Sequence, residues 1–174
     1  MKILVVGNGG REHALAWKLA NDSAKPEIYS TPGNAGTAEV GTNLDLGATD
    51  LDGIRNWCAE NQPDLVVIGP EAPLCAGLAD VLEADGIRVF GPCKAAAELE
   101  GSKQFAKEIM EAAGVPTSAY ETFIDPEQAC AYVRERGAPI VIKADGLAAG
   151  KGVTVAETVE QAEAAIRDAL EGNA

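Results

Sequence analysis

Short apolar runs recur through the first part of the chain, and each ends in glycine, proline or a polar turn. These runs predict strands at 3–6, 27–30, 43–46, 64–68 and 87–90. Apolar residues spaced three and four apart predict helices at 14–20, 50–60, 74–84 and 92–100. Strands that alternate with helices indicate a parallel sheet with right-handed crossovers. Residues 1–101 are therefore predicted to form a Rossmann-like α/β domain.

The pattern changes after residue 101. Residues 102–117 are predicted to be a linking helix and connector, with Gly114 ending the helix. Polar and apolar residues alternate over 118–123, which predicts a strand. The elements that follow are a helix beginning after Asp125, strands at 139–142 and 153–156, and a helix at 158–170. The order β-α-β-β-α over 118–174 is typical of an α+β unit.

Composition and net charge limit the kinds of partner and binding site that the chain is expected to have. The 174 residues are 47% apolar, so the chain can bury a core. A net charge of −13 disfavours nucleic acid as a partner. The longest apolar runs are about five residues, far below the roughly 20 that span a bilayer. Four widely spaced cysteines and one histidine indicate neither a zinc site nor a disulfide framework, and free thiols in a reducing cytoplasm are expected.

The first predicted strand leads into Gly7-Asn8-Gly9-Gly10-Arg11-Glu12-His13 and then into a helix. Strand, glycine turn and helix N-terminus together predict an anion site, because backbone amides and the helix dipole both favour negative charge. The dinucleotide fingerprint needs glycine at position 12, where this chain has Glu12, and the second strand lacks a terminal acidic residue. Nicotinamide binding is therefore disfavoured. His13 is predicted to be a helix-face residue beside the loop.

Two further loops follow predicted strands, at the edge where open α/β sheets place ligands. Pro32 to Gly36 is rich in glycine, and an ordinary turn is an equally good interpretation. Glu71 lies between Pro70 and Pro73, where its carboxylate could accept hydrogen bonds from sugar hydroxyls. A solvated loop glutamate is the alternative.

The segment from Pro139 to Val153 carries the strongest chemical signal. A short apolar run, predicted to be a buried strand, ends at Lys143, and Gly146, Gly150, Lys151 and Gly152 follow. A strand, a lysine and a glycine-rich loop with a second lysine can hold the phosphates of a nucleotide. The spacing does not match a Walker A loop. A glycine-rich hairpin turn with two solvated lysines is the alternative.

Four segments, taken together, resemble the phosphoribosylamine–glycine ligase (glycinamide ribonucleotide synthetase) family of the ATP-grasp superfamily. They are residues 1–12, Pro32-Gly33-Asn34-Ala35-Gly36, residues 69–74 and residues 143–153. The resemblance implies a Rossmann-like (pre-ATP-grasp) domain followed by an incomplete α+β ATP-grasp lobe. It also implies de novo purine biosynthesis, in which ATP, glycine and 5-phosphoribosylamine yield glycinamide ribonucleotide through a glycyl phosphate.

The family's functional residues are carried over by position. Residues that the resemblance implies for the nucleotide are Lys103, Lys143, Asp145, Gly146, Gly150, Lys151 and Gly152. Residues that it implies for 5-phosphoribosylamine are Gly9, Gly10, Arg11, Glu12, Asn34 and Glu71. It places no catalytic residue and no metal ligand within this segment.

Family members are much longer, so the chain is expected to be a fragment that is inactive alone. The Mg2+ ligands are expected beyond Ala174, in a second lobe. The alternative is a non-catalytic module, derived from the ligase, that binds a phosphosugar or a nucleotide. A cytoplasmic location is expected, with no membrane or nucleic acid partner, and a monomer is favoured.

Overall fold

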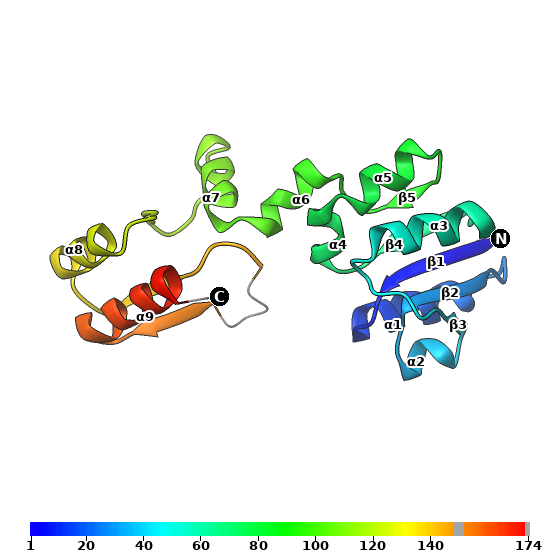
Figure 1. Cartoon of the computed structure of the whole chain (residues 1–174), viewed down its shortest axis with the longest axis horizontal. Helices are drawn as coiled ribbons and strands as arrows, with labels where there is room; N and C mark the ends of the chain where they lie inside the picture. Colours follow the sequence, from blue (N-terminus) through cyan, green and yellow to red (C-terminus); the bar gives the residue numbers. More distant parts are fainter. Residues whose placement is uncertain (148–151, 173–174) are drawn as a thin grey trace. The chain divides into compact units, whose positions relative to one another are not determined.

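The computed structural model describes residues 1–147 and 152–172. The chain divides into two compact units, Met1–Gly101 and Ser102–Ala174 (Figure 1). Among the described residues, no helix is both long enough and apolar enough to cross a lipid bilayer.

The first unit is built on a five-stranded parallel sheet with the order β3-β2-β1-β4-β5. The strands are β1 (Lys2–Gly7), β2 (Glu27–Pro32), β3 (Thr42–Asn43), β4 (Leu65–Ile68) and β5 (Val89–Phe90). Val6 of β1 pairs with Thr31 on one side and with Ile68 on the other. The strand order reverses at β1, so this position is the topological switch point of the sheet.

Six helices of the first unit connect or follow these strands. They are α1 (Gly10–Ala20), α2 (Ala35–Ala38), α3 (Leu51–Asn61), α4 (Glu71–Ala76), α5 (Leu78–Ala84) and α6 (Lys94–Gly101). The single helix predicted over 74–84 is wrong, because Gly77 adopts a left-handed φ of +97° and divides the segment in two. Asp50 caps α3 by accepting a hydrogen bond from the Gly53 amide.

Both faces of the parallel sheet are covered. Leu4 and Val6 of β1 pack on one face against α3 and α5, including Ile54. Ile3 and Val5 pack on the other face, against α1. The side chains of residues 3–6 are at most 1% exposed. A strand buried on two faces must be apolar at every position, and for that reason the continuous run at 3–6 predicted it correctly.

The second unit packs helices on one face of a two-stranded antiparallel sheet. Its elements are α7 (Lys103–Ala112), α8 (Pro126–Arg136), β6 (Ile140–Lys143), β7 (Val153–Ala156) and α9 (Val159–Glu171). Cys130 and Val133 of α8 meet Ala162 and Ile166 of α9 in the core of this unit. Asp125 and Thr158 cap α8 and α9 by accepting hydrogen bonds from backbone amides.

Two predictions for this unit are wrong. Residues 118–123 form no strand, because side chains rather than a backbone ladder fix this segment. Lys107 Nζ donates to Thr117 Oγ1 at 2.7 Å and to the Ser118 carbonyl at 2.9 Å. The strand at 139–142 is not fully buried either, since β6 has helices on one face only and Val141 is 48% exposed.

Candidate functional site

The first set of predicted site residues lies in the first unit, where β1 and β4 end side by side. Arg11 and Glu12 belong to the first turn of α1, which follows β1, and Glu71 begins α4, which follows β4. Glu71 therefore lies at a helix N-terminus and not in the loop between prolines that the sequence suggested. The crevice beyond the carboxyl ends of strands at a switch point is where open α/β sheets bind ligands.

Arg11 links the first turns of α1 and α4. Its Nε donates to Glu12 Oε1 at 2.8 Å, and its Nη1 donates to Glu71 Oε1 at 3.3 Å. The Arg11 side chain is 54% exposed, so its guanidinium is accessible to a ligand. Hydrogen bonding to Glu12, and secondarily to Glu71, raises the pKa of Arg11 above its ordinary value. Arg11 is therefore a permanent cation at the switch point.

Glu71 is half exposed and ionised near neutral pH. A hydrogen bond from its own backbone amide lowers the pKa of Glu71, and Arg11 contributes to the same shift against the opposing effect of partial burial. An accessible carboxylate accepts hydrogen bonds only, which suits sugar hydroxyl donors. Its position next to a cation that suits phosphate makes the pair complementary to a phosphorylated sugar.

Asn34 joins a third loop to the same place. Its side-chain oxygen accepts from the Thr37 amide at 3.0 Å and so caps α2. Its Nδ2 donates to the carbonyls of Asn8 and Gly9 at 2.9 and 3.1 Å. The Pro32–Gly36 loop is thereby tied to the loop after β1, and His13 packs against it at Gly36.

The second set of predicted residues lies in the second unit, at the start of α7. Asp145 Oδ1 accepts from the Lys103 amide at 2.5 Å, and Oδ2 accepts from Ser102 Oγ at 2.9 Å. Lys103 Nζ donates to the Gly146 carbonyl at 2.8 Å. The sequence reasoning did not identify Ser102 as part of this cluster, although a serine before a helix is a typical N-cap.

The contacts around Asp145 explain how a lysine can occupy the first position of α7, where the helix dipole disfavours positive charge. Lys103 occupies the first position of α7, where positive charge is unfavourable. Asp145 supplies a compensating negative charge from the chain itself. Partial burial opposes ionisation of Asp145, but hydrogen bonds from the Lys103 amide, Ser102 and the Gly146 amide outweigh it and lower its pKa.

Lys143 ends β6 on the sheet face that the helices leave open. Ile140 and Ile142 pack towards α8 and α9, so Val141 and Lys143 point to the opposite face. Val155 and Val153 of β7 lie directly across from them in the antiparallel register. We call the set Val141, Lys143, Val153 and Val155 the outer face of the hairpin. This face presents three exposed valines with one cation at its end.

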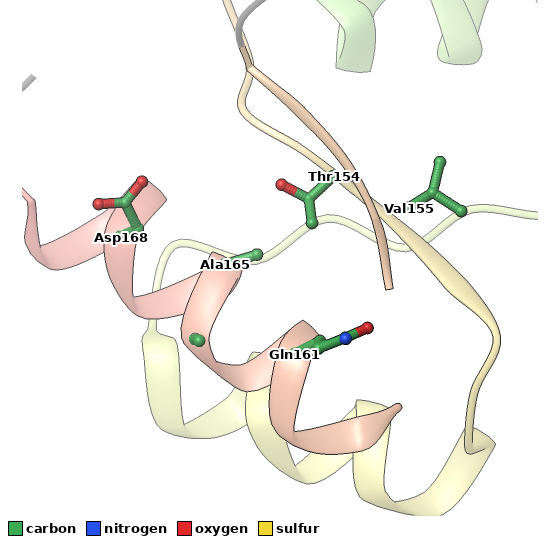
Figure 2. A pocket seen from close by; sticks show the side chains of 6 residues that line it. Thr154, Val155, Gln161, Ala165 and Asp168 are labelled. Atoms are coloured by element: carbon green, nitrogen blue, oxygen red, sulfur yellow. The ribbon is translucent and has the colours of Figure 1, made fainter. Parts of the chain in front are cut away.

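A shallow hollow of about 470 Å³ lies elsewhere in this unit, beside β7 and α9. Thr154, Val155, Gln161, Ala164, Ala165 and Asp168 line it (Figure 2). None of the residues predicted to bind nucleotide belongs to it, and its side chains include no cation. The hollow is therefore not the candidate site.

The remaining predicted residues are placed as follows. Gly152 lies at the end of the glycine-rich connection, where its carbonyl accepts from the Ala144 amide at 2.8 Å. Gly150 and Lys151 lie outside the described residues. Within the described ranges, no three His, Cys, Asp or Glu side chains gather to hold a metal ion.

Comparison with known proteins covers the whole chain. The family model for the phosphoribosylglycinamide synthetase N domain matches residues 1–100, and the model for the ATP-grasp (A) domain of the same synthetase matches residues 101–174. The phosphoribosylamine–glycine ligase of Escherichia coli O6:H1 is 53% identical over 100% of this chain. The chain spans 41% of the length of that relative.

Solved structures agree on the fold. A crystal structure of phosphoribosylamine–glycine ligase from Thermotoga maritima has a TM-score of 0.75 and 31% identity, covering 99% of this chain and 41% of that one. The biotin carboxylase domain of the Hydrogenobacter thermophilus 2-oxoglutarate carboxylase, solved with MgADP, has a TM-score of 0.75 at 22% identity. It covers 98% of this chain and 41% of that one, and at this identity the likeness concerns the fold alone.

Proposed function

The chain belongs to the phosphoribosylglycinamide synthetase family, and we propose that it supplies the phosphosugar-binding domain and the first ATP-grasp segment of a ligase. The proposed reaction joins glycine to 5-phosphoribosylamine at the expense of ATP and forms glycinamide ribonucleotide for purine biosynthesis. The observation that carries the proposal is the Arg11–Glu71 pair at the switch point of the parallel sheet. A cytoplasmic location accords with four free cysteines.

The phosphosugar is proposed to bind where β1 and β4 end. Its phosphate would meet Arg11 and the first backbone amides of α1, which have no acceptor within their own helix. Its ribose hydroxyls would donate to Glu71. Asn34 supports the shape of this pocket, because its amide group is committed to the carbonyls of Asn8 and Gly9.

The nucleotide is proposed to bind in the second unit. Lys103 and Lys143 would face its phosphates, and the outer face of the hairpin would contact its base. ATP supplies the phosphoryl group that activates the glycine carboxylate. The lysines would hold the nucleotide and balance negative charge on its phosphate oxygens, a contribution that is electrostatic and positional.

Magnesium is implied by the ATP-grasp family, but the described residues contain no cluster of acidic side chains to hold it. No step is assigned to the metal from this chain. Since the chain spans 41% of the length of its relative, we expect the 174-residue protein to bind substrate without completing the reaction.

The test is ADP formation that requires both glycine and 5-phosphoribosylamine. We expect the product of the complete natural gene to release ADP only when both substrates are present. The same assay on the 174-residue chain should give no turnover. Absence of turnover by the complete gene product would favour the non-catalytic binding module. Turnover by the 174-residue chain alone would refute the proposal that this chain binds substrate without completing the reaction.

A further inference from the structure

Glu12 is buried between two loops of the first unit. The residue is 3% exposed, in contrast to its neighbour Arg11. Its Oε2 accepts from the Gly9 amide at 2.8 Å, and its Oε1 accepts from Arg11 Nε at 2.8 Å. A Cβ atom added at Gly69 would overlap the same carboxylate. The Glu12 side chain thus occupies the space between the loop after β1 and the loop after β4.

A carboxylate in this position needs a partner, because an unpaired buried charge is strongly unfavourable. Arg11 is that partner, and it binds Glu12 through Nε, the donor nearest its aliphatic stem. This contact restrains the stem and leaves the end of the guanidinium exposed. Of the five N–H groups of the guanidinium, two are used by Glu12 and Glu71 within the described residues.

We propose that Glu12 is a positioning residue for the phosphosugar pocket and does not itself touch the substrate. It fixes Arg11 from the interior, so that the remaining guanidinium donors point to where a sugar phosphate binds. It also holds the Gly9 amide and separates the two loops at a constant distance. This inference rests on the proposed function for the identity of the ligand, and it changes the role of Glu12 from ligand contact to support.

The variant Glu12→Gln distinguishes the contact with the Gly9 amide from the contact with Arg11 Nε. Its amide oxygen can still accept from the Gly9 amide, so the loop keeps its hydrogen bond. Its amide nitrogen then faces Arg11 Nε, where two donors meet and the compensating negative charge is lost. The exposed pair Arg55–Asp85 offers a matched control, because Arg55 Nε also donates to a carboxylate, at 2.6 Å.

The first measurement needs no ligand. Hydrogen exchange of the Arg11 Nε–H group is followed by NMR in the wild-type chain, in Glu12→Gln and in Asp85→Asn. We expect exchange of this group to be about tenfold faster in Glu12→Gln, which corresponds to the loss of one charge-assisted hydrogen bond. Asp85→Asn should leave Arg11 unchanged.

The second measurement is calorimetric titration of the 174-residue chain with glycinamide ribonucleotide. We expect Glu12→Gln to raise Kd by about tenfold, again equivalent to one such hydrogen bond. Asp85→Asn should bind as the wild type does. In an Arg11→Ala background, Glu12→Gln should change Kd by less than about twofold, because coupled residues are not additive.

Several outcomes would overturn the positioning role. They are unchanged Arg11 exchange in Glu12→Gln, unchanged binding in that variant, or an equal loss of affinity in the Arg11→Ala background. If Glu12→Gln does not fold, Glu71→Gln removes the other partner of Arg11 from the surface. Arg11 exchange that rises about tenfold in Glu71→Gln would also contradict the inference.

Failure of the proposed function gives a different result. If wild-type chain does not bind glycinamide ribonucleotide while Arg11 exchange responds to Glu12→Gln as expected, the ligand assignment is wrong. Glu12 would then still be the residue that orients Arg11. The ligand-free experiment therefore distinguishes the two failures.

Discussion

Replacing Asp145 with asparagine tests the cluster at the start of α7. The change keeps the size of the side chain and one oxygen acceptor, and it removes the negative charge. Asp145 accepts hydrogen bonds from Ser102 Oγ at 2.9 Å, from the Lys103 amide at 2.5 Å and from the Gln104 amide at 3.4 Å. Each of these donors lies in the first turn of α7 or at its cap. We therefore expect Asp145→Asn to loosen the attachment of α7.

The magnitude follows from these contacts. Hydrogen bonds to charged groups contribute about 1.5–3 kcal/mol each when they are shielded from water. Asp145 is exposed, so solvent screens its charge, and the bond at 3.4 Å is long. We expect Asp145→Asn to lower the free energy of opening α7 by about 1–2 kcal/mol at pH 7.

The pH dependence has a definite sign. The pKa of Asp145 is lowered in the folded chain, so its ionised form stabilises the fold above the ordinary aspartate pKa of about 3.9. That contribution is lost as the pH falls through the folded pKa. The difference between wild type and Asp145→Asn should therefore be full at pH 7 and should shrink below about pH 4.

Amide hydrogen exchange of α7 measures this opening directly. Trp17 and Trp57 both lie in the first unit, so tryptophan fluorescence monitors that unit as an internal control. Asp168→Asn removes one charge from the exposed surface of α9 and serves as the matched variant. The reasoning would be refuted if Asp145→Asn left α7 exchange unchanged at pH 7, or if Asp168→Asn accelerated it equally.

Three further predictions follow from burial and geometry. Gly69→Ala should lower the free energy of unfolding by about 1–3 kcal/mol, because the added Cβ would overlap the buried carboxylate of Glu12. Gly10→Ala is the control: a Cβ there meets nothing within 4 Å, so the free energy of unfolding should change by less than about 0.5 kcal/mol. Urea titration followed by tryptophan fluorescence compares the two variants. Burial raises the pKa of Cys58 to about 11, so at pH 8 a thiol reagent should label exposed Cys93 first, and equal rates would contradict this order. Val155→Thr should leave the second unit folded by circular dichroism, because Val155 is 63% exposed, and loss of the fold would show that this face is buried.

The parallel sheet could be predicted because its residues carry a local signal. Residues 3–6 of β1 are buried on both faces, so their side chains must all be apolar, and this run is visible in the sequence without any partner. The loop after β1 was likewise marked by its glycines and by Arg11. These features depend on neighbours in the sequence, which a reading of the sequence can use.

The features that the sequence did not reveal depend on contacts in the folded chain. Asp145 accepts a hydrogen bond from the Lys103 amide, 42 residues earlier in the chain, and no periodic pattern in the sequence predicts that contact. Glu12 is buried although glutamate is rarely buried, because Arg11 and the Gly9 amide compensate its charge locally. The alternation at 118–123 suggested a strand, but a strand also needs a neighbour with which to pair, and side chains of α7 hold this segment instead.

The outer face of the hairpin has a consequence for how the protein behaves in solution. Val141, Val153 and Val155 are 48%, 45% and 63% exposed, on a two-stranded sheet whose backbone edges have no further strand beside them in the described residues. Such a surface favours self-association of identical molecules. A net charge of −13 opposes it by mutual repulsion. Because salt screens that repulsion and acid reduces it towards the isoelectric point of 4.4, the protein stays dispersed best in neutral buffers of low ionic strength.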